Sequence, residues 1–408
     1  MDFSHSARTK EYLNRVKQFM KNEIEPIEHA YHTTMLEKHN GGNWTAWEIP
    51  PMIEELKTKA RAQGLWNLFI PEEGYEGPGM SNVEYAPLAE EMGKSFIAPL
   101  IFNCNAPDSG NMEVLIKYGS EEQKKKWLTP LLEGKIRSAF CMTEPQVASS
   151  DATNMEATAL LEGNEVVING TKWWSTGIGH PECKIIIFMG LTHPEEAKYA
   201  QHSMVLVPVN TPGVKIVRML PVFGDYDEPI GHGEVEFKNV RVPAANVILG
   251  PGRGFEIAQG RLGPGRIHHC MRCIGAAERA LELMIKRGME RVAFGKPIIN
   301  LGGNRERIAD LRIAIDQARL LTLQAAWKID IYGAMGAIMD VSAIKVIVPN
   351  VLQQVADEAI QMFGGMGLSH DVPLAAIFAN AKVLRIADGP DAVHRGIVAR
   401  YEVRKYQK

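Results

Sequence analysis

The strongest constraint on this chain is a block of short β-type runs between two long regions of helical pattern. Within residues 138–250, runs rich in β-branched residues alternate with turns, which is typical of a small all-β domain. The runs cover residues 157–162, 165–169, 184–191, 203–209, 214–220 and 233–240. Strands and helices do not alternate one by one, so a doubly wound dinucleotide-binding domain is not expected.

Helical signals fill the regions on either side of this block. In residues 1–137, Ser120 is followed three positions later by Gln123, which predicts a capping box. Residues 251–408 carry two apolar stripes at spacings of three and four, which predict long helices of an antiparallel bundle. The stripes comprise Ile308, Leu311, Ile315, Ala318, Ala325 and Ile329, then Ile344, Ile347, Val351, Val355 and Met362. Pro349 lies inside the second stripe and is expected to kink that helix.

These patterns predict an α+β multidomain protein with helical, β and helical domains at residues 1–137, 138–250 and 251–408. The chain of 408 residues has 45 Lys and Arg against 48 Asp and Glu, a net charge of -3. That balance argues against a protein that binds nucleic-acid backbones by charge alone.

Cysteine usage and apolar run length bear on the compartment. The five cysteines are too few and too scattered for a disulfide framework, which indicates reduced thiols. The N-terminal residues show no secretory pattern, and the densest apolar stretch, residues 185–189, is too short to span a bilayer. We therefore expect no membrane association, and a location in the cytoplasm of a bacterium or, in a eukaryote, the mitochondrial matrix.

Two motifs at the β block have the chemistry to bind a flat, phosphorylated ligand. Residues 140–151 are small and polar, and their N–H groups and hydroxyls could bind a heteroaromatic ring and a diphosphate, although a plain polar turn has the same composition. In residues 170–177, paired tryptophans stand beside Thr176. An indole can cover a flat ring and the Thr hydroxyl can bond to it, although tryptophans of a β-domain core would look the same.

Three motifs in the C-terminal region also carry chemistry. Arg291, at a predicted helix end, could bind a diphosphate or be a solvated cation at the helix terminus. Glycines in residues 361–367 allow close approach to a phosphate or sugar, or cap a helix. Asp388, before Gly-Pro, could project into a cleft as a base; the alternative role, capping the last helix, suits Asp391 better.

Two patterns suggest other sites and are interpreted structurally. Cys270 and Cys273 follow His268 and His269, but no second ligand pair at zinc spacing follows, so we expect packed thiols on a helix and no metal. Residues 252–254 begin a partial glycine fingerprint without a βαβ unit and are interpreted as a hinge between domains.

In their order and spacing, these motifs resemble the acyl-CoA dehydrogenase family from end to end. The resemblance rests on Thr-Glu-Pro at residues 143–145 with Ser-Ser-Asp at 149–151, Lys-Trp-Trp-Ser-Thr at 172–176, Arg-Val-Ala-Phe-Gly at 291–295 and Gln-Met-Phe-Gly-Gly-Met-Gly at 361–367. The chain looks most like the branch that in animals is fused to a kinase-like domain, which shares Ala-Asp-Gly-Pro-Asp at 387–391.

The resemblance implies a fold, a cofactor and an assembly. The fold would be an N-terminal helical domain, a middle β-barrel and a C-terminal four-helix bundle. The cofactor would be FAD, bound by a homodimer or homotetramer that shares its flavin sites between subunits. The implied flavin ligands within one subunit are Phe140, Met142, Thr143, Ser149, Ser150, Trp174 and Thr176. Those implied for the neighbouring subunit's flavin are Arg291, Phe294, Gln361, Gly364 and Gly365, and Pro390 and Ala392 complete the cofactor set.

The resemblance also implies the reaction. Asp388 would remove the α-proton of an acyl-CoA thioester, a β-hydride would pass to flavin N5, and trans-2-enoyl-CoA would form. Substrate contacts would come from Ser149, Arg266 and Gly389, and electrons would go to an electron-transfer flavoprotein. The family usually has Glu where this chain has Asp388. Some members place the base at the position of residues 263–266, where this chain has no carboxylate.

Two other flavoproteins on the same fold remain as alternatives. Nitroalkane oxidases resemble this family, use an Asp base and pass electrons to oxygen. The alkylation-response branch associates with nucleic acid, but the net charge of -3 weighs against it. The sequence leaves open the length, branching and hydroxylation of the acyl chain, and does not separate a dimer from a tetramer.

Overall fold

The computed structural model describes residues 4–407, apart from the side chains of residues 261–264. The chain divides into two compact units, each assembled from distant segments. The sheet unit comprises Ile27–Pro78 and Leu100–Leu262, and the helical unit comprises Met1–Pro26, Gly79–Pro99 and Gly263–Lys408. The two boundaries between the three domains expected from sequence stay a prediction.

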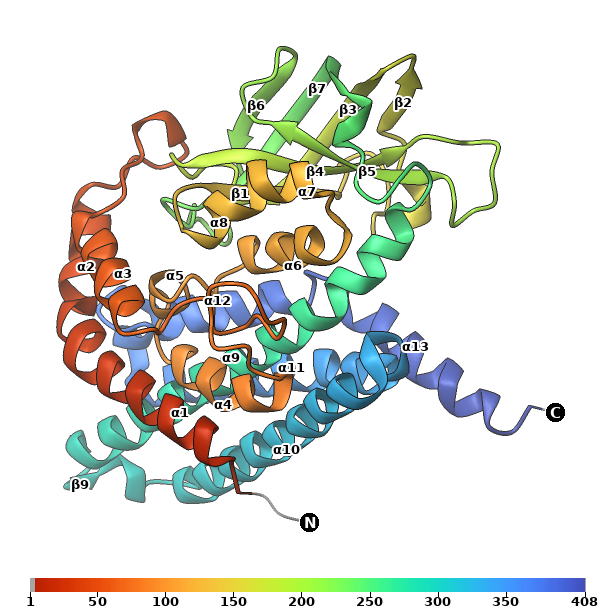
Figure 1. Cartoon of the computed structure of the whole chain (residues 1–408). Helices are drawn as coiled ribbons and strands as arrows, with labels where there is room; N and C mark the ends of the chain where they lie inside the picture. The colour runs from red at the N-terminus through yellow and green to blue at the C-terminus, as the bar shows by residue number, and fades with distance from the viewer. Residues whose placement is uncertain (1–3, 408) are drawn as a thin grey trace. The chain divides into compact units, whose positions relative to one another are not determined.

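The predicted β domain is one curled sheet of seven strands (Figure 1). The strands are β1 (Arg137–Cys141), β2 (Thr158–Glu162), β3 (Glu165–Thr176), β4 (Cys183–Leu191), β5 (His202–Pro208), β6 (Val214–Met219) and β7 (His232–Pro243). Their order is β1-β4-β2-β3-β7-β6, with β5 also paired to β4. β4 is parallel to β1 and β2, and the other pairs are antiparallel. All six predicted runs are strands, because their alternating apolar residues pack into one core around Phe188 and Phe237.

β1 was not predicted, and a buried polar group holds it in place. Arg137 on β1 pairs with Asp108 at 2.7 Å, and both side chains are 3% exposed. Asp108 also accepts from the backbone N–H of Ser138 at 2.6 Å. The two buried charges are paired with each other, and the contacts of Asp108 fix α6 against the first strand.

Of the helices in the sheet unit, α6 packs against β1 (Figure 1). The helices of this unit are α3 (Pro51–Ala62), α6 (Asp108–Tyr118), α7 (Glu121–Gln123) and α8 (Thr129–Leu132), while α2 (Glu25–Glu37) and α5 (Ala98–Ile101) cross the unit boundaries. The capping box at the start of α7 is confirmed. Ser120 Oγ accepts from the Gln123 N–H at 3.2 Å, and Gln123 Oε1 accepts from the Ser120 N–H at 3.1 Å.

The helical unit is built around long helices, as the apolar stripes predict. Its elements are α1 (Ala7–Phe19), α4 (Asn82–Met92), most of α9 (Gly254–Glu290), α10 (Asn304–Gly336), α11 (Ile338–Phe363), α12 (Leu374–Leu384), α13 (Asp391–Arg404) and a hairpin of β8 (Val292–Ala293) and β9 (Lys296–Pro297). α11 runs through Pro349 as one helix, so the expected kink does not divide it. The helical backbone is interrupted instead at Gly333 of α10, whose φ of 71° suits a residue without a Cβ. Ile347 is 40% exposed, outside the buried face of its stripe.

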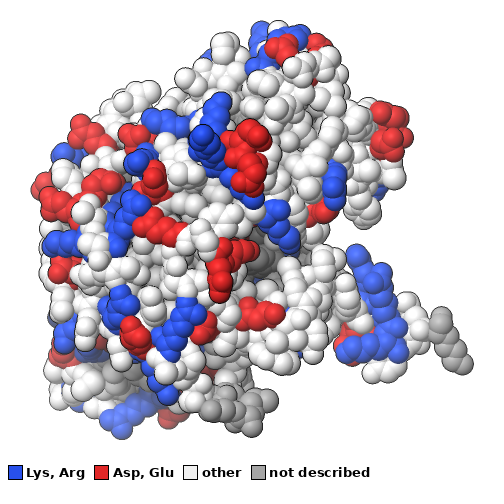
Figure 2. Space-filling model, viewed as in Figure 1, with Lys and Arg blue, Asp and Glu red and all other residues white. Residues whose placement is uncertain are grey.

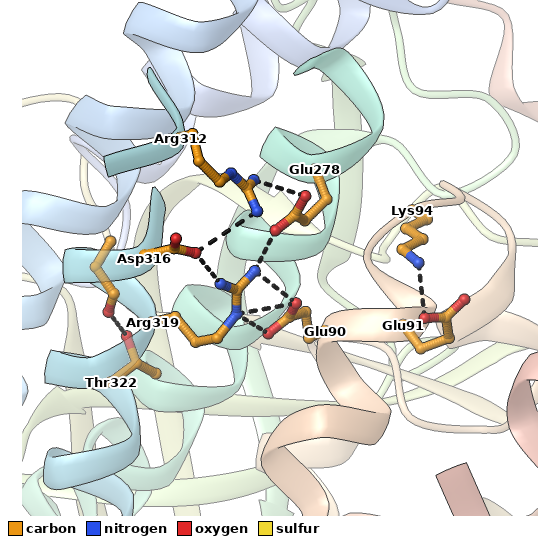
Figure 3. A network of polar contacts seen from close by, with 9 residues as sticks. Glu90, Glu91, Lys94, Glu278, Arg312, Asp316, Arg319 and Thr322 are labelled. Carbon is orange, nitrogen blue, oxygen red and sulfur yellow. Dashed lines mark hydrogen bonds and ion pairs between the residues drawn. The ribbon is translucent and has the colours of Figure 1, made fainter. Parts of the chain in front are cut away.

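An ion-pair network joins α4, α9 and α10 (Figure 3). Arg319 on α10 forks onto Glu90 of α4, with two N–O distances of 3.0 Å, and contacts Glu278 of α9. Burial lowers the pKa of Arg319, but Glu90 and Glu278 outweigh it and raise the pKa above its usual value. α4 and α9 can lie this close because a Cβ on Gly275 would stand 1.8 Å from the Glu90 carbonyl oxygen. The middle of α9 is therefore held firmly against α4.

One stretch, Ile338–Leu368, is long and apolar enough to cross a membrane by length and composition. Of its most apolar window, 56% is buried inside the structure, which is the pattern of a core helix.

Candidate functional site

Asp388 lies in the short loop between α12 and α13, in a strained backbone conformation. Its φ is 55°, and that of Gly389 is 101°, so two consecutive residues adopt left-handed angles. A Cβ on Gly389 would also stand 2.9 Å from His394 Nε2. The Asp388 carbonyl oxygen accepts from Arg266 Nε at 3.0 Å and lies 3.2 Å from His394 Nε2. The backbone of Asp388 is thus held by side chains of α9 and α13. Arg266 lies close to the proposed base, as the family resemblance implies.

The side chain of Asp388 is 22% exposed and faces α9. Its Oδ2 lies 3.5 Å from Nε2 of His269, and His269 Nδ1 lies 3.2 Å from an Arg272 nitrogen. In the sequence, the two histidines were interpreted together with Cys270 and Cys273 as structural residues without a catalytic role. The signal that could have found His269 is its spacing: residues 266, 269 and 272 recur every third position and share one helix face.

Two buried groups beneath the loop add to its electrostatics. His394 is fully buried, and burial lowers its pKa to about 4, with the Arg266 charge acting in the same direction. A carbonyl only accepts, so His394 Nε2 carries the proton toward Asp388 and Nδ1 accepts from Ser342, 3.2 Å away. Lys345 donates to the Leu384 carbonyl, and burial lowers its pKa against the attraction of Cys270 and Asp388.

Asp391 is not the helix cap that the sequence suggested. Pro390 occupies the cap position, and Asp391 is the first residue of α13. Its carboxylate accepts from Arg385 Nε at 2.9 Å and from Asn350 Nδ2 at 3.0 Å. Burial alone would raise the pKa of Asp391, but these two bonds lower it. Asp391 and Arg385 thereby tie together the two ends of the loop that carries Asp388, while Ala392 is exposed on the first turn of α13.

In the sheet unit, the first predicted flavin motif begins inside a strand. Phe140 and Cys141 end β1, so the loop starts at Met142 and not at Phe140 as expected. Lys172 donates to the Met142 carbonyl at 2.8 Å and to Glu144 Oε1 at 2.7 Å. Ser149 Oγ accepts from the Glu144 N–H at 2.9 Å. The loop that holds Thr143, Ser149 and the exposed Ser150 is therefore fixed from below by a buried lysine.

The second flavin motif follows a bulge between β3 and β7. Trp174 has a φ of 51° and is 41% exposed, so the core interpretation is wrong for this residue. Thr176 Oγ1 lies 2.9 Å from His232 Nδ1, and the rings of Trp174 and His232 are 5.9 Å apart. The Trp173 N–H donates to the Thr143 carbonyl at 2.9 Å, so the structure brings the two motifs of this unit together.

Five of the remaining predicted flavin residues lie in the helical unit, on two neighbouring helix ends. Arg291 follows α9 and is exposed, and Phe294 on the β8–β9 turn is 94% exposed. Gln361 and Gly364 are at the end of α11, where Gly364 (φ 66°) caps the helix and Gly365 has open space at its Cβ position. The two ends pack together, because the Arg287 guanidinium lies 5.4 Å from the ring centre of Phe363. The predicted flavin residues therefore form one group in the sheet unit and one on these helix ends, while Pro390 and Ala392 lie at the start of α13.

The donor set fits FAD. The buried indole N–H of Trp173 has no hydrogen-bond partner among the described residues. The same group holds the hydroxyls of Thr143 and Thr176 and the exposed Trp174, whose ring centre lies 6.4 Å from that of Trp173. The other group offers the exposed guanidinium of Arg291 and open space at the Cβ positions of Gly364 and Gly365. These are the groups that a flat polar ring and a diphosphate require.

The structure confirms that the two cysteines of the Cys270–Cys273 pair are packed thiols. Cys270 and Cys273 are buried on α9, and burial raises the pKa of Cys273 to about 12. His268 packs edge-on against Tyr85, at 5.0 Å between ring centres, and burial lowers its pKa to about 3. Within residues 4–407, no group of three or more His, Cys, Asp or Glu could hold a metal ion. The predicted hinge at 252–254 directly precedes the body of α9, and residues 263 and 264 of the alternative base position lie outside the described side chains.

Comparison with known proteins decides the family. Models of the acyl-CoA dehydrogenase N-terminal, middle and C-terminal domains match residues 6–135, 139–240 and 252–402. A protein of Mycobacterium tuberculosis named "Probable acyl-CoA dehydrogenase FadE2" is 51% identical over 99% of this chain and 98% of its own length. This chain belongs to the acyl-CoA dehydrogenase family. A solved structure from Mycobacterium abscessus, described as that of an acyl-CoA dehydrogenase, is 64% identical, with a TM-score of 0.96 over 99% of this chain and 100% of that one.

The animal branch is also among the relatives. Acyl-CoA dehydrogenase family member 11 of Gallus gallus is 54% identical over 100% of this chain, which spans 52% of that protein. The chain thus spans about half the length of such relatives. Members of the acyl-CoA dehydrogenase family are FAD-dependent oxidoreductases, and this chain is one of them. A more distant solved structure, PigA with FAD and proline, is 25% identical with a TM-score of 0.83, covering 98% of this chain and 99% of that one.

Proposed function

We propose that this chain dehydrogenates an acyl-CoA thioester to a trans-2-enoyl-CoA, with Asp388 as the base that removes the α-proton. The observation that carries the proposal is the anchored carboxylate of Asp388. Its backbone has a strained φ and is held by Arg266 and His394. Such strain is typical of a residue whose exact position is needed for function. FAD, held by the predicted flavin residues, would supply the hydride acceptor for this reaction.

The surroundings of Asp388 suit a base. The α-proton of a thioester is weakly acidic, so the carboxylate must be ionised and partly shielded from water. Arg266 on α9 and Lys345 on α11 bring positive charge toward the loop, which favours the ionised carboxylate. Asp is one methylene shorter than the Glu usual in the family. A short base needs its backbone held closer to the substrate, and the two bonds to the Asp388 carbonyl provide such a restraint.

We further propose that the active protein is a homodimer or homotetramer with shared flavin sites. Apolar side chains about 50% exposed recur at helical spacing along α10: Ile313, Leu320, Trp327 and Ile331. A continuous apolar stripe of this kind on a helix is typical of a face covered by another chain. Phe294, at 94% exposure, would likewise be covered by the neighbouring subunit's flavin region. An electron-transfer flavoprotein as acceptor and a cytoplasmic or mitochondrial location stay predictions.

The substrate panel tests this function. Purified holoprotein is titrated anaerobically with acyl-CoAs of increasing length and with branched and hydroxylated variants, while the flavin absorbance is followed. The proposal predicts that one subset bleaches the flavin, and that Asp388→Asn binds FAD but is not bleached. If no acyl-CoA bleaches the wild type, the proposal is wrong.

The aspartate in place of glutamate favours one second candidate, a nitroalkane oxidase with oxygen as acceptor. Oxygen consumption with a nitroalkane, and none with acyl-CoAs, would identify it. Association with nucleic acid has less support, because Figure 2 shows acidic and basic side chains interspersed over most of the face in view. A DNA mobility shift that weakens with salt would reveal it.

A further inference from the structure

Three side chains of α9 act on the Asp388 loop in two different ways. Arg266 donates to the backbone carbonyl of Asp388, whereas His269 faces its carboxylate. Arg272 faces His269 from the other side, with its nitrogen 3.2 Å from Nδ1. One turn of a single helix therefore holds the backbone of the base and also contacts its reactive group.

The contact with Arg272 fixes where His269 carries its proton. A guanidinium has only donors, so it can bond to Nδ1 only when that nitrogen is an acceptor. The proton of the neutral ring is then on Nε2, the atom that lies 3.5 Å from Asp388 Oδ2. The Nε2–H of His269 therefore points at the carboxylate of Asp388.

We propose that His269 is the positioning residue of the base: its Nε2–H holds one carboxylate oxygen of Asp388 so that the other oxygen meets the substrate's α-carbon. This inference rests on the proposed function of Asp388. At 3.5 Å the contact is longer than a good hydrogen bond, and such contacts commonly shorten when substrate binds. When the free oxygen takes the α-proton, the bond from His269 stays with the other oxygen.

The rigidity that this role needs is present in α9. A Cβ on Gly93, which caps the C-terminal end of α4, would stand 2.1 Å from the Arg272 carbonyl, so the end of α4 touches α9 backbone to backbone at this turn. The ion pairs of Glu90 and Glu278 with Arg319 hold the same helices one to two turns further along (Figure 3). His269 therefore stands on a fixed platform, which is what the positioning of a catalytic group demands.

Charged and titratable groups on three packed helices lie around this pair. They include Arg266, His268, Cys270 and Arg272 on α9, Lys345 on α11 and His394 on α13. Burial keeps Cys270 protonated and His394 neutral near pH 7, because it raises the pKa of the thiol and lowers that of the imidazole to about 4. In the proposed reaction, protonation of Asp388 removes the base and should shape the acidic limb of the rate profile.

The test compares His269→Leu with His269→Gln in the FAD-loaded protein, using the acyl-CoA that bleaches the wild type. The rate of anaerobic flavin reduction should fall about 10- to 100-fold in His269→Leu, while the half-saturating acyl-CoA concentration changes little. Loss of the donor should raise the pKa of Asp388, so the acidic limb should move up by about one pH unit. Gln offers an N–H at a similar reach and should restore most of the rate.

The matched control is His268→Leu on the same helix, because the ring of His268 packs edge-on against Tyr85. It should leave the acidic limb where it is. Arg272→Met is a second test variant. It removes the guanidinium that fixes the tautomer of His269, so it should lower the rate although Asp388 and His269 are both unchanged. An unchanged rate and pH profile in both His269→Leu and Arg272→Met overturns the inference. Should His269→Leu not fold, Arg272→Met alone decides.

The proposed function is tested separately in the same series. If wild type is bleached and Asp388→Asn is not, yet His269→Leu behaves as wild type, only the role of His269 is wrong. If wild type is not bleached by any acyl-CoA, the proposed function itself has failed.

Discussion

Replacement of Lys172 by Met tests how the flavin loop of the sheet unit is held. Lys172 is 0% exposed and its partner Glu144 is 3% exposed, with 2.7 Å between Nζ and Oε1. The lysine also donates to the Met142 carbonyl at 2.8 Å, and Glu144 accepts from the N–H groups of Glu156 and Ala157. One ion pair therefore joins the start of the loop to the strand that follows it.

The magnitude follows from what the substitution leaves behind. Burial lowers the pKa of Lys172 in spite of Glu144, which means that the desolvation penalty of the ammonium exceeds its favourable interaction with Glu144. Lys172→Met nevertheless leaves the Glu144 carboxylate buried without its cation, which should cost about 3–5 kcal/mol. Adding Glu144→Gln removes that stranded charge. The double variant should therefore recover much of the loss, with a coupling of about 1–3 kcal/mol between the two sites.

Denaturant unfolding of the wild type, both single variants and the double variant measures this cycle, followed by both far-UV circular dichroism and tryptophan fluorescence. Lys215→Met, an exposed lysine on β6, is the matched control and should change stability by less than about 0.5 kcal/mol. Lys172→Met should also weaken FAD binding, because the Met142 carbonyl loses its donor. The reasoning is refuted if Lys172→Met is no less stable than Lys215→Met, or if the double variant is no more stable than Lys172→Met.

Three further predictions concern stability and assembly. Burial lowers the pKa of three histidines to about 2, about 3 and about 4 (His180, His268 and His394). The contribution of each neutral histidine to the free energy of unfolding is complete above the unfolded pKa of about 6.5 and is lost as pH falls toward the folded pKa. Lowering the pH to 5 should therefore reduce the free energy of unfolding by about 2 kcal/mol for each histidine. Equal unfolding midpoints at pH 7.5 and pH 5 would contradict this. Gly275→Ala places a Cβ 1.8 Å from the Glu90 carbonyl and should destabilise by at least about 1–3 kcal/mol, whereas Gly396→Ala, in open space on α13, should not lower the melting temperature. Leu320→Lys should reduce the mass measured by light scattering with little loss of helicity, and an unchanged mass would remove α10 from the interface.

The sequence predicted elements wherever side-chain period and burial agree. The stripe through Leu311 and Ile315 is buried on α10, and the strand through 184–191 is almost wholly buried in the sheet. The sequence pattern did not predict β1. That strand is short, and the residues before it, Gly, Lys and Ile, show no alternation of apolar and polar side chains. The pattern also stopped β3 at Asn169, although the strand runs to Thr176, because long antiparallel pairing with β7 overrides the break at Gly170.

The site was predictable by motif but not by contact. Asp388 and Arg266 came from the family pattern, and the structure brings them together. His269 was passed over because its meaning depends on Asp388, which lies more than 100 positions away in the chain and reaches α9 only through the fold. Asp391 was assigned as a cap from local preference, while Arg385 and Asn350 compete successfully for its carboxylate.

The central claim is that Asp388 removes the α-proton of an acyl-CoA. Its most direct test is the anaerobic rate of flavin reduction, measured by stopped flow with an acyl-CoA and with the same acyl-CoA deuterated at the α-carbon. The account predicts that α-deuteration slows the wild type and that Asp388→Asn, loaded with FAD, loses at least 100-fold in rate. Reduction of Asp388→Asn at the wild-type rate would contradict it and place the base elsewhere in the chain.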